Sequence, residues 1–117
     1  MNETQRISNL KKLIKDVASY LRKECPPMHP VRILVKELPK GTWGDCELKE
    51  GKNGDFFLVR ISNKLSPDGG YLVLVHEWAH VLAENKEKKP HDKHWGIEYA
   101  KIWRNLTDEK RKECTLV

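Results

Sequence analysis

The chain has 117 residues, of which 38% are hydrophobic and 33% are charged. This length and composition indicate one globular domain with a modest core. No segment approaches the roughly 18 consecutive apolar residues of a membrane span. The net charge of +5 permits contact with an acidic partner such as DNA. Because the basic residues are scattered along the chain, we expect at most weak, nonspecific DNA contact.

The three cysteines, Cys25, Cys46 and Cys114, lie far apart and form no Cys-x-x-Cys pair. A zinc ribbon within this chain is therefore excluded, and an odd number of thiols argues against a disulfide framework. The first residues lead into an amphipathic segment and not into the apolar core of a signal peptide. We therefore expect a cytoplasmic protein.

The first half of the chain predicts a helix followed by three strands. Apolar residues recur at helical spacing from Ile7 to Leu21, which predicts an amphipathic helix over residues 4–24. Alternating apolar residues and β-branched or aromatic side chains predict strands at residues 31–35, 42–48 and 56–61. A turn signal at Gly51 and Gly54 separates the last two strands.

The second half of the chain predicts two helices. Ser66-Pro67 offers a helix N-terminus, which Gly69-Gly70 can delay, and this helix should run to about Glu87. Pro90 ends it, and Asp92 can cap a last helix. The buried face of that helix is marked by apolar residues at helical spacing: Trp95, Tyr99, Ile102, Trp103 and Leu106.

This order of elements predicts a small α+β fold in which residues 1–117 form a single domain. We expect an N-terminal helix, then a three-stranded, mostly antiparallel sheet, then the motif helix and a closing C-terminal helix. The tail at residues 107–117 is highly charged, and we expect it to fray.

The segment His76-Glu77-Trp78-Ala79-His80 lies in an apolar run, residues 71–83, without glycine or proline. On a helix, His76 and His80 lie one turn apart on one face, so both can direct a ring nitrogen at one ion. Catalytic Zn²⁺ has three protein ligands and one open position, and Glu77 would lie beside that position as a general base. This is the H-E-x-x-H arrangement of zinc metallopeptidases. The alternative is a core helix whose histidines are satisfied by ordinary hydrogen bonds.

A catalytic zinc site needs a third protein ligand, which should follow the motif helix. Three residues are candidates: His91, His94 and Glu98. His91 follows the helix break at Pro90, where the chain can fold back towards the motif. His94 and Glu98 lie further along the last helix.

The two histidine segments, residues 74–82 and 91–104, resemble SprT-like zinc metallopeptidases, and in particular the small single-domain members found in phages and prophages. The resemblance covers about residues 41–104. It implies a zincin-like fold, zinc bound by His76, His80 and His91, and Glu77 as the catalytic base. His91 with Trp95 matches the family's His-x-x-x-aromatic pattern, and His94 is the alternative third ligand. No DNA-targeting module accompanies the domain, which argues against a role in DNA repair.

The sequence therefore predicts a zinc-dependent endopeptidase that hydrolyses peptide bonds in a protein or peptide substrate. We expect the substrate to lie extended along a sheet edge, for which residues 56–61 are the candidate strand. The alternative is a non-catalytic, zinc-containing module that binds DNA or protein on the same fold. A zinc hydrolase that acts on a non-peptide amide is a third hypothesis.

Overall fold

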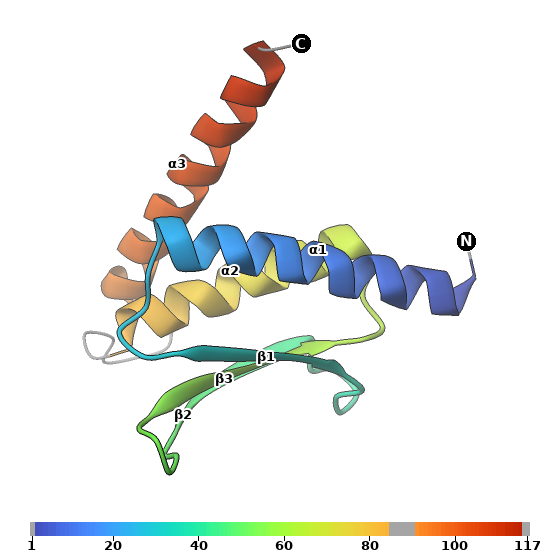
Figure 1. The fold of residues 1–117 in the computed structure, drawn as a ribbon, viewed down its shortest axis with the longest axis horizontal. Coiled ribbons are helices and arrows are strands. Elements are labelled where there is room, and N and C mark those ends of the chain that lie inside the picture. Colours follow the sequence, from blue (N-terminus) through green and yellow to red (C-terminus); the bar gives the residue numbers. More distant parts are fainter. Residues whose placement is uncertain (1, 85–90, 116–117) are drawn as a thin grey trace.

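The structure is a computed structural model that describes residues 2–84 and 91–115, with side chains described up to residue 106. Its elements follow in the order α1 (Glu3–Glu24), β1 (Val31–Lys36), β2 (Gly44–Lys49), β3 (Phe56–Ser62), α2 (Pro67–Ala83) and α3 (Lys93–Thr115) (Figure 1). The predicted α+β class and the order of elements are confirmed. The expected end of the motif helix at Glu87 lies outside the described residues, and α2 is described as far as Ala83.

The sheet is mixed, so the expectation of a mostly antiparallel sheet is wrong. Its strand order is β1-β3-β2, with β2 antiparallel to β3 and β1 parallel to β3. The turn between Gly51 and Gly54 joins β2 and β3 as a hairpin. The chain leaving β1 crosses to the far side of β3 before β2 begins, so β1 and β2 are not neighbours. Consecutive strands pair only about two-thirds of the time, and sequence alternation does not reveal the exceptions.

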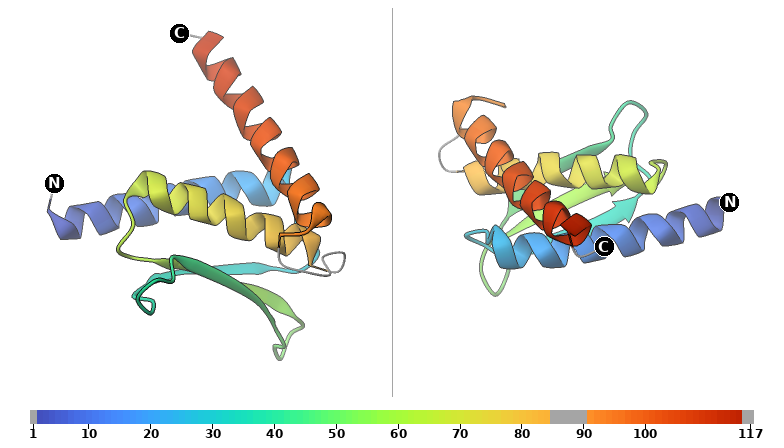
Figure 2. Two further views of the ribbon diagram at one scale, coloured as in Figure 1. Left: turned by 180° about the vertical axis from the view of Figure 1, so that it is seen from behind. Right: turned by 90° about the horizontal axis from the view of Figure 1, so that it is seen from above.

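Helices α1 and α2 lie side by side over one face of the sheet (Figure 2). The central strand points Phe57, Val59 and Ile61 into this layer, where all three are buried. The predicted stripe of α1 supplies the opposing surface, with Leu10, Ile14, Ala18 and Leu21. The first part of α3 packs on α2, and its C-terminal part extends away from the sheet (Figure 1). The core thus lies between the sheet and the α1–α2 layer.

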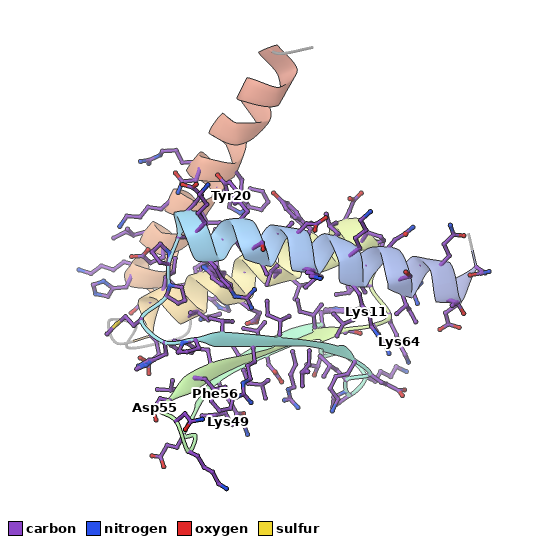
Figure 3. The ribbon with its side chains drawn as sticks, in the orientation of Figure 1. Lys11, Tyr20, Lys49, Asp55, Phe56 and Lys64 are labelled. Atoms are coloured by element: carbon purple, nitrogen blue, oxygen red, sulfur yellow. The ribbon has the colours of Figure 1, made fainter. Side chains whose placement is uncertain are left out.

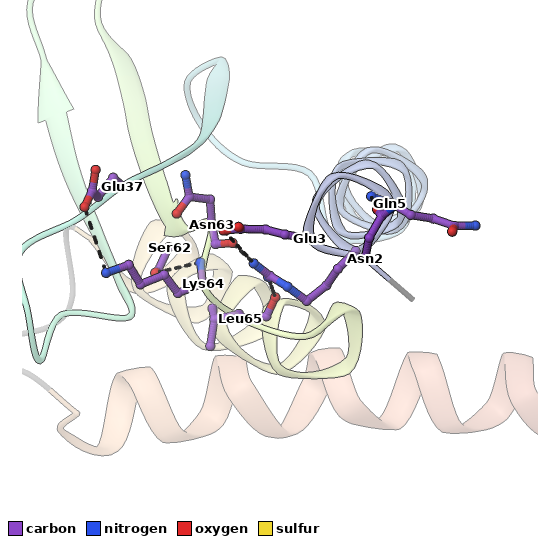
Figure 4. Close-up of polar contacts among 9 residues, drawn as sticks. Asn2, Glu3, Gln5, Glu37, Ser62, Asn63, Lys64 and Leu65 are labelled. Atoms are coloured by element: carbon purple, nitrogen blue, oxygen red, sulfur yellow. Dashed lines mark hydrogen bonds and ion pairs between the residues drawn. The ribbon is translucent and has the colours of Figure 1, made fainter.

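Hydrogen bonds from α1 hold the chain where it enters α2. The guanidinium of Arg6 donates to the backbone oxygens of Asn63 at 2.8 Å and Leu65 at 2.6 Å (Figure 4). The side chain of Ser66 accepts a hydrogen bond from Gly69 N, so α2 begins at Pro67 and the two glycines do not delay it. Gly70 is a close approach, because a Cβ there would overlap Cδ1 of Leu10 on α1.

None of the described helices is long and apolar enough to cross a membrane. Among the described side chains, Lys11 and Lys64 lie near one end of the molecule and Lys49 near the other (Figure 3). Cys25 is buried and Cys46 is half-buried. The side chain of Cys114 lies outside the described part of the chain.

Candidate metal centre

Helix α2 presents the two motif histidines together. His76 and His80 are one turn apart, with ring centroids separated by 5.2 Å. Two of the residues between them, Trp78 and Ala79, face the other way and are completely buried in the core. The indole of Trp78 also donates a hydrogen bond of 2.9 Å to the backbone oxygen of Cys25. This packing sets the rotation of α2 about its axis and therefore directs both imidazoles towards the same side.

His91 is the third member of the cluster. Its Nε2 lies 2.9 Å from Nε2 of His76 and 3.1 Å from Nε2 of His80. Its backbone has a φ of 61°, and it is the one non-glycine residue with positive φ among those described. This left-handed conformation is uncommon for side chains with a Cβ, and it often marks functional sites. A reversal of the chain just before α3 thus returns the imidazole to α2.

The convergence of these nitrogens fits a shared cation better than a set of hydrogen bonds. A neutral imidazole nitrogen either carries one proton or offers one lone pair, so Nε2 of His91 cannot form full hydrogen bonds with both neighbours. Nitrogen ligands about 2.0–2.1 Å from a tetrahedral Zn²⁺ lie roughly 3.3 Å from one another. The two observed separations are close to that value. The three histidines therefore lie close enough to bind one metal ion.

Glu77 lies beside this cluster but is not a member of it. Its side chain is only 5% exposed and lines the same cleft as the three imidazoles. Strand β2 approaches at Gly44: a Cβ there would lie 3.7 Å from Cγ of Glu77 and would overlap Cγ1 of Val73. The absence of a side chain at Gly44 therefore lets β2 pass directly against the side chain of Glu77. The sequence does not reveal this role, because a single glycine at the start of a strand predicts no particular contact.

The start of α3 is held by Asp92, as predicted. Its carboxylate accepts hydrogen bonds from the backbone nitrogens of His94 at 2.9 Å and Trp95 at 3.3 Å. Because Asp92 directly follows His91, this cap also positions the third histidine. His94 has its backbone in the cap and lies outside the histidine cluster. Glu98, the other candidate, is outside the cluster as well and forms an ion pair with Lys101.

Trp95 has a role at this centre that helical spacing alone did not predict. Its ring lies 5.1, 5.7 and 4.7 Å from the rings of His76, His80 and His91, measured between centroids. Its indole N–H also donates to the backbone oxygen of His76 at 3.3 Å. The indole is therefore a wall against which all three imidazoles rest. The feature of the sequence that could have predicted this contact is the position of Trp95, four residues after His91.

Tyr99 continues this wall into the cleft. It stacks on Trp95 at 4.7 Å, with the two ring planes 16° apart. The side chain is half-buried, as its place on the inner face of α3 predicted, but it also lines the cleft. The predicted buried face of α3 is otherwise confirmed, since Ile102 is fully buried and Trp103 and Leu106 pack against the core.

The cluster opens into a cleft of about 1000 Å³ between α2 and residues 41–48. Strand β2 is an edge of the sheet, whereas β3 is its centre. The expectation that residues 56–61 form the exposed edge is therefore wrong, because both sides of β3 are already paired. Next to the cleft, Asp45 forms a salt bridge with Arg60, and this hydrogen bond raises the pKa of the guanidinium above its ordinary value.

The direction of the backbone groups on β2 follows from its pairing. The backbone oxygen of Trp43 accepts from Ser62 N, so residues alternating from Trp43 direct their amides towards β3. Gly44 and Leu48, which alternate with them, direct their backbone groups towards the open edge. The edge beside the metal centre is thus oriented to pair with an extended chain.

Searches of protein-family models, curated proteins and solved structures found no match to this chain. The resemblance to SprT-like metallopeptidases rests on the two histidine segments, and it stays a prediction. The structure shows a coarser fact: three histidines from two parts of the chain meet in a cleft of a small α+β domain.

Proposed function

We propose that this chain is a zinc-dependent metallopeptidase of the SprT-like type. The observation that carries the proposal is the meeting of His76, His80 and His91 beside the buried carboxylate of Glu77, at the wall of an open cleft. A structural zinc site is closed by four protein ligands, whereas a catalytic site has three and remains open. Among the described residues, the cluster contains three donors and faces the cleft.

The three imidazoles would hold the metal, and their chemistry favours zinc. Neutral imidazole nitrogen suits Zn²⁺ and other borderline ions, whereas Mg²⁺ and Ca²⁺ require oxygen donors. Zinc, when bound, supplies a Lewis acid that polarises a carbonyl and activates water. The Trp95 wall and the Asp92 cap would hold the imidazoles in place and limit the access of solvent from the α3 side.

Glu77 would be the general base. It directly follows a proposed ligand on α2, lines the cleft and is not itself in the donor cluster. Its carboxylate would accept a proton from the attacking water and pass it to the amine that leaves. The tight passage of β2 at Gly44 would keep the carboxylate directed at the cleft.

The substrate would lie extended along β2. Backbone groups of Gly44 and Leu48 would pair with its main chain, which places a peptide bond between the edge strand and the histidines. Recognition through the main chain is independent of side chains, so it suits a peptidase acting on unfolded segments.

The test compares wild-type protein with Glu77→Gln on a casein or other unfolded protein substrate. The wild type should hydrolyse it, and Glu77→Gln should retain its zinc and its fold but lose about 10²–10⁴-fold in rate, because the amide cannot accept the proton. Zinc content and circular dichroism provide the controls. Equal rates for the two proteins would remove Glu77 from the mechanism, and no hydrolysis by the zinc-loaded wild type would favour a non-catalytic module.

A further inference from the structure

The face of α2 that lines the cleft has a different chemistry at each end. Four residues spaced four apart line the cleft along this helix: Leu72, His76, His80 and Glu84. This spacing keeps them on one side of the helix. The proposed metal ligands lie in the middle, with an apolar side chain one turn before them and a carboxylate one turn after.

At the apolar end, two large hydrophobic residues are exposed to solvent. Leu72 is 52% exposed and Trp43, across the cleft, is 55% exposed. Both residues line the cleft, and each directly precedes a residue of the tight Gly44–Val73 contact between β2 and α2. Large apolar side chains grouped at a cleft mark a place where an apolar ligand group is received.

The opposite end of this helix face carries the carboxylate of Glu84. Among the described residues that line the cleft there is no lysine or arginine, and Glu77 and Glu84 of α2 both line it. Asp45 pairs with Arg60 and Glu47 pairs with Lys49. Glu84, the C-cap of α2, takes part in no ion pair within residues 2–84 and 91–106. A cationic group in the cleft would find its complement at Glu84.

The spacing along the helix matches an extended peptide. Each step of four residues on α2 rises about 6 Å, and two residues of an extended chain cover about 6.6 Å. Leu72 and Glu84 are therefore about 18 Å apart along the helix, which corresponds to five or six residues of substrate. Side chains six positions apart on a strand point to the same side.

We propose that the cleft selects an extended segment that places a bulky apolar side chain against Leu72 and Trp43 and a lysine or arginine side chain near Glu84. The inference rests on the proposed function, because it takes the cleft as the place where the substrate lies. Selection at the two ends would position the peptide bond between them at the histidines.

The experiment measures binding, so that it does not depend on turnover. Zinc-loaded Glu77→Gln is titrated into fluorescein-labelled peptides of alanine and serine that carry Phe and Lys six positions apart, in both orders. In the tighter order, replacing Phe by Ala should weaken binding about 10-fold, since a buried aromatic side chain contributes at least that much. Replacing Lys by Ala should weaken it about 2- to 5-fold, as for an exposed ion pair.

Variants of the protein assign each effect to its residue. With Leu72→Ser added, the Phe effect should fall below 2-fold while the Lys effect remains, and Glu84→Gln should do the reverse. Ile97→Ser is the matched control, because Ile97 is an exposed apolar residue of similar accessibility (51%) on α3 that does not line the cleft. It should change neither effect. Zinc content of every variant is measured in parallel.

Equal affinity for all peptides, or equal effects of Leu72→Ser and Ile97→Ser, would overturn the inference. Hydrolysis of unfolded protein by the wild type without this selectivity would also overturn it, while the proposed function would stand. Selective binding without hydrolysis would support the inference and overturn only the enzymatic proposal.

Discussion

Gly44 gives the sharpest link between packing and the proposed chemistry. A methyl group added there would overlap Cγ1 of Val73 and would lie 3.1 Å from the backbone oxygen of Arg60. Val73 is β-branched and therefore has little freedom to rotate within a helix. The oxygen belongs to the central strand and cannot give way by side-chain rotation. Gly44→Ala must therefore move β2 away from α2.

The size of the effect follows from these contacts. Overpacking of this kind costs about 1–3 kcal/mol, and a less flexible unfolded chain offsets about 0.4–1 kcal/mol. We expect a net loss of about 1 kcal/mol in the free energy of unfolding, which lowers Tm by about 3–6 °C in a domain of this size. Because β2 passes against Glu77, a shift near 1 Å should also reduce hydrolysis by about 10²-fold.

Gly70→Ala separates the two effects. Its methyl group would overlap Cδ1 of Leu10 at the α1–α2 contact, away from the cleft, so it should lower Tm without changing the rate of the folded enzyme. For both variants, we would measure thermal unfolding by circular dichroism. Hydrolysis rates would be measured at a temperature well below both values of Tm. Equal losses of rate in both, or an unchanged Tm and rate for Gly44→Ala, would refute the reasoning.

Three further predictions concern the metal and the surface. His91→Gly should lose zinc while keeping its fold, because glycine suits a φ of 61°, whereas His94→Ala should retain most of the metal. Zinc content after dialysis tests this, and the opposite pattern would assign the third ligand to His94. Trp95→Phe should keep the ring wall but lose the hydrogen bond to His76, weakening zinc binding by about 10- to 100-fold in a competition titration; an unchanged affinity would show that this bond does not position the ligand. A short DNA duplex should bind weakly and lose affinity steeply as salt rises, by anisotropy at two salt concentrations, and tight binding at physiological salt would contradict this.

Local periodicity was sufficient to predict the elements of this fold. The stripe from Ile7 to Leu21 predicted α1 to within one residue at its start, because a helix must bury one face. The apolar run around the motif predicted a largely buried helix, and α2 is one. Strand partners were harder, since the parallel pairing of β1 with β3 depends on a crossover and on packing beneath the helices. Because this pairing was not predicted, residues 56–61 were wrongly expected to form the exposed edge of the sheet.

The candidate site was predictable in its residues and not in its geometry. Spacing brought His76 and His80 together, because one turn of helix does so in any context. The spacing around Pro90 left His91, His94 and Glu98 open, and the choice among them depends on a left-handed backbone that the sequence does not reveal. The wall formed by Trp95 and the passage of β2 at Gly44 are likewise contacts between distant segments.

The central claim is that three histidines hold one zinc ion, and the most direct measurement is the zinc stoichiometry of protein purified without added metal. We predict one equivalent per chain for the wild type, retained after dialysis. X-ray absorption of the same sample should show nitrogen ligands at about 2.0–2.1 Å and no sulfur. Metal near zero that dialysis against zinc does not restore, or a site with cysteine ligands, would contradict the account.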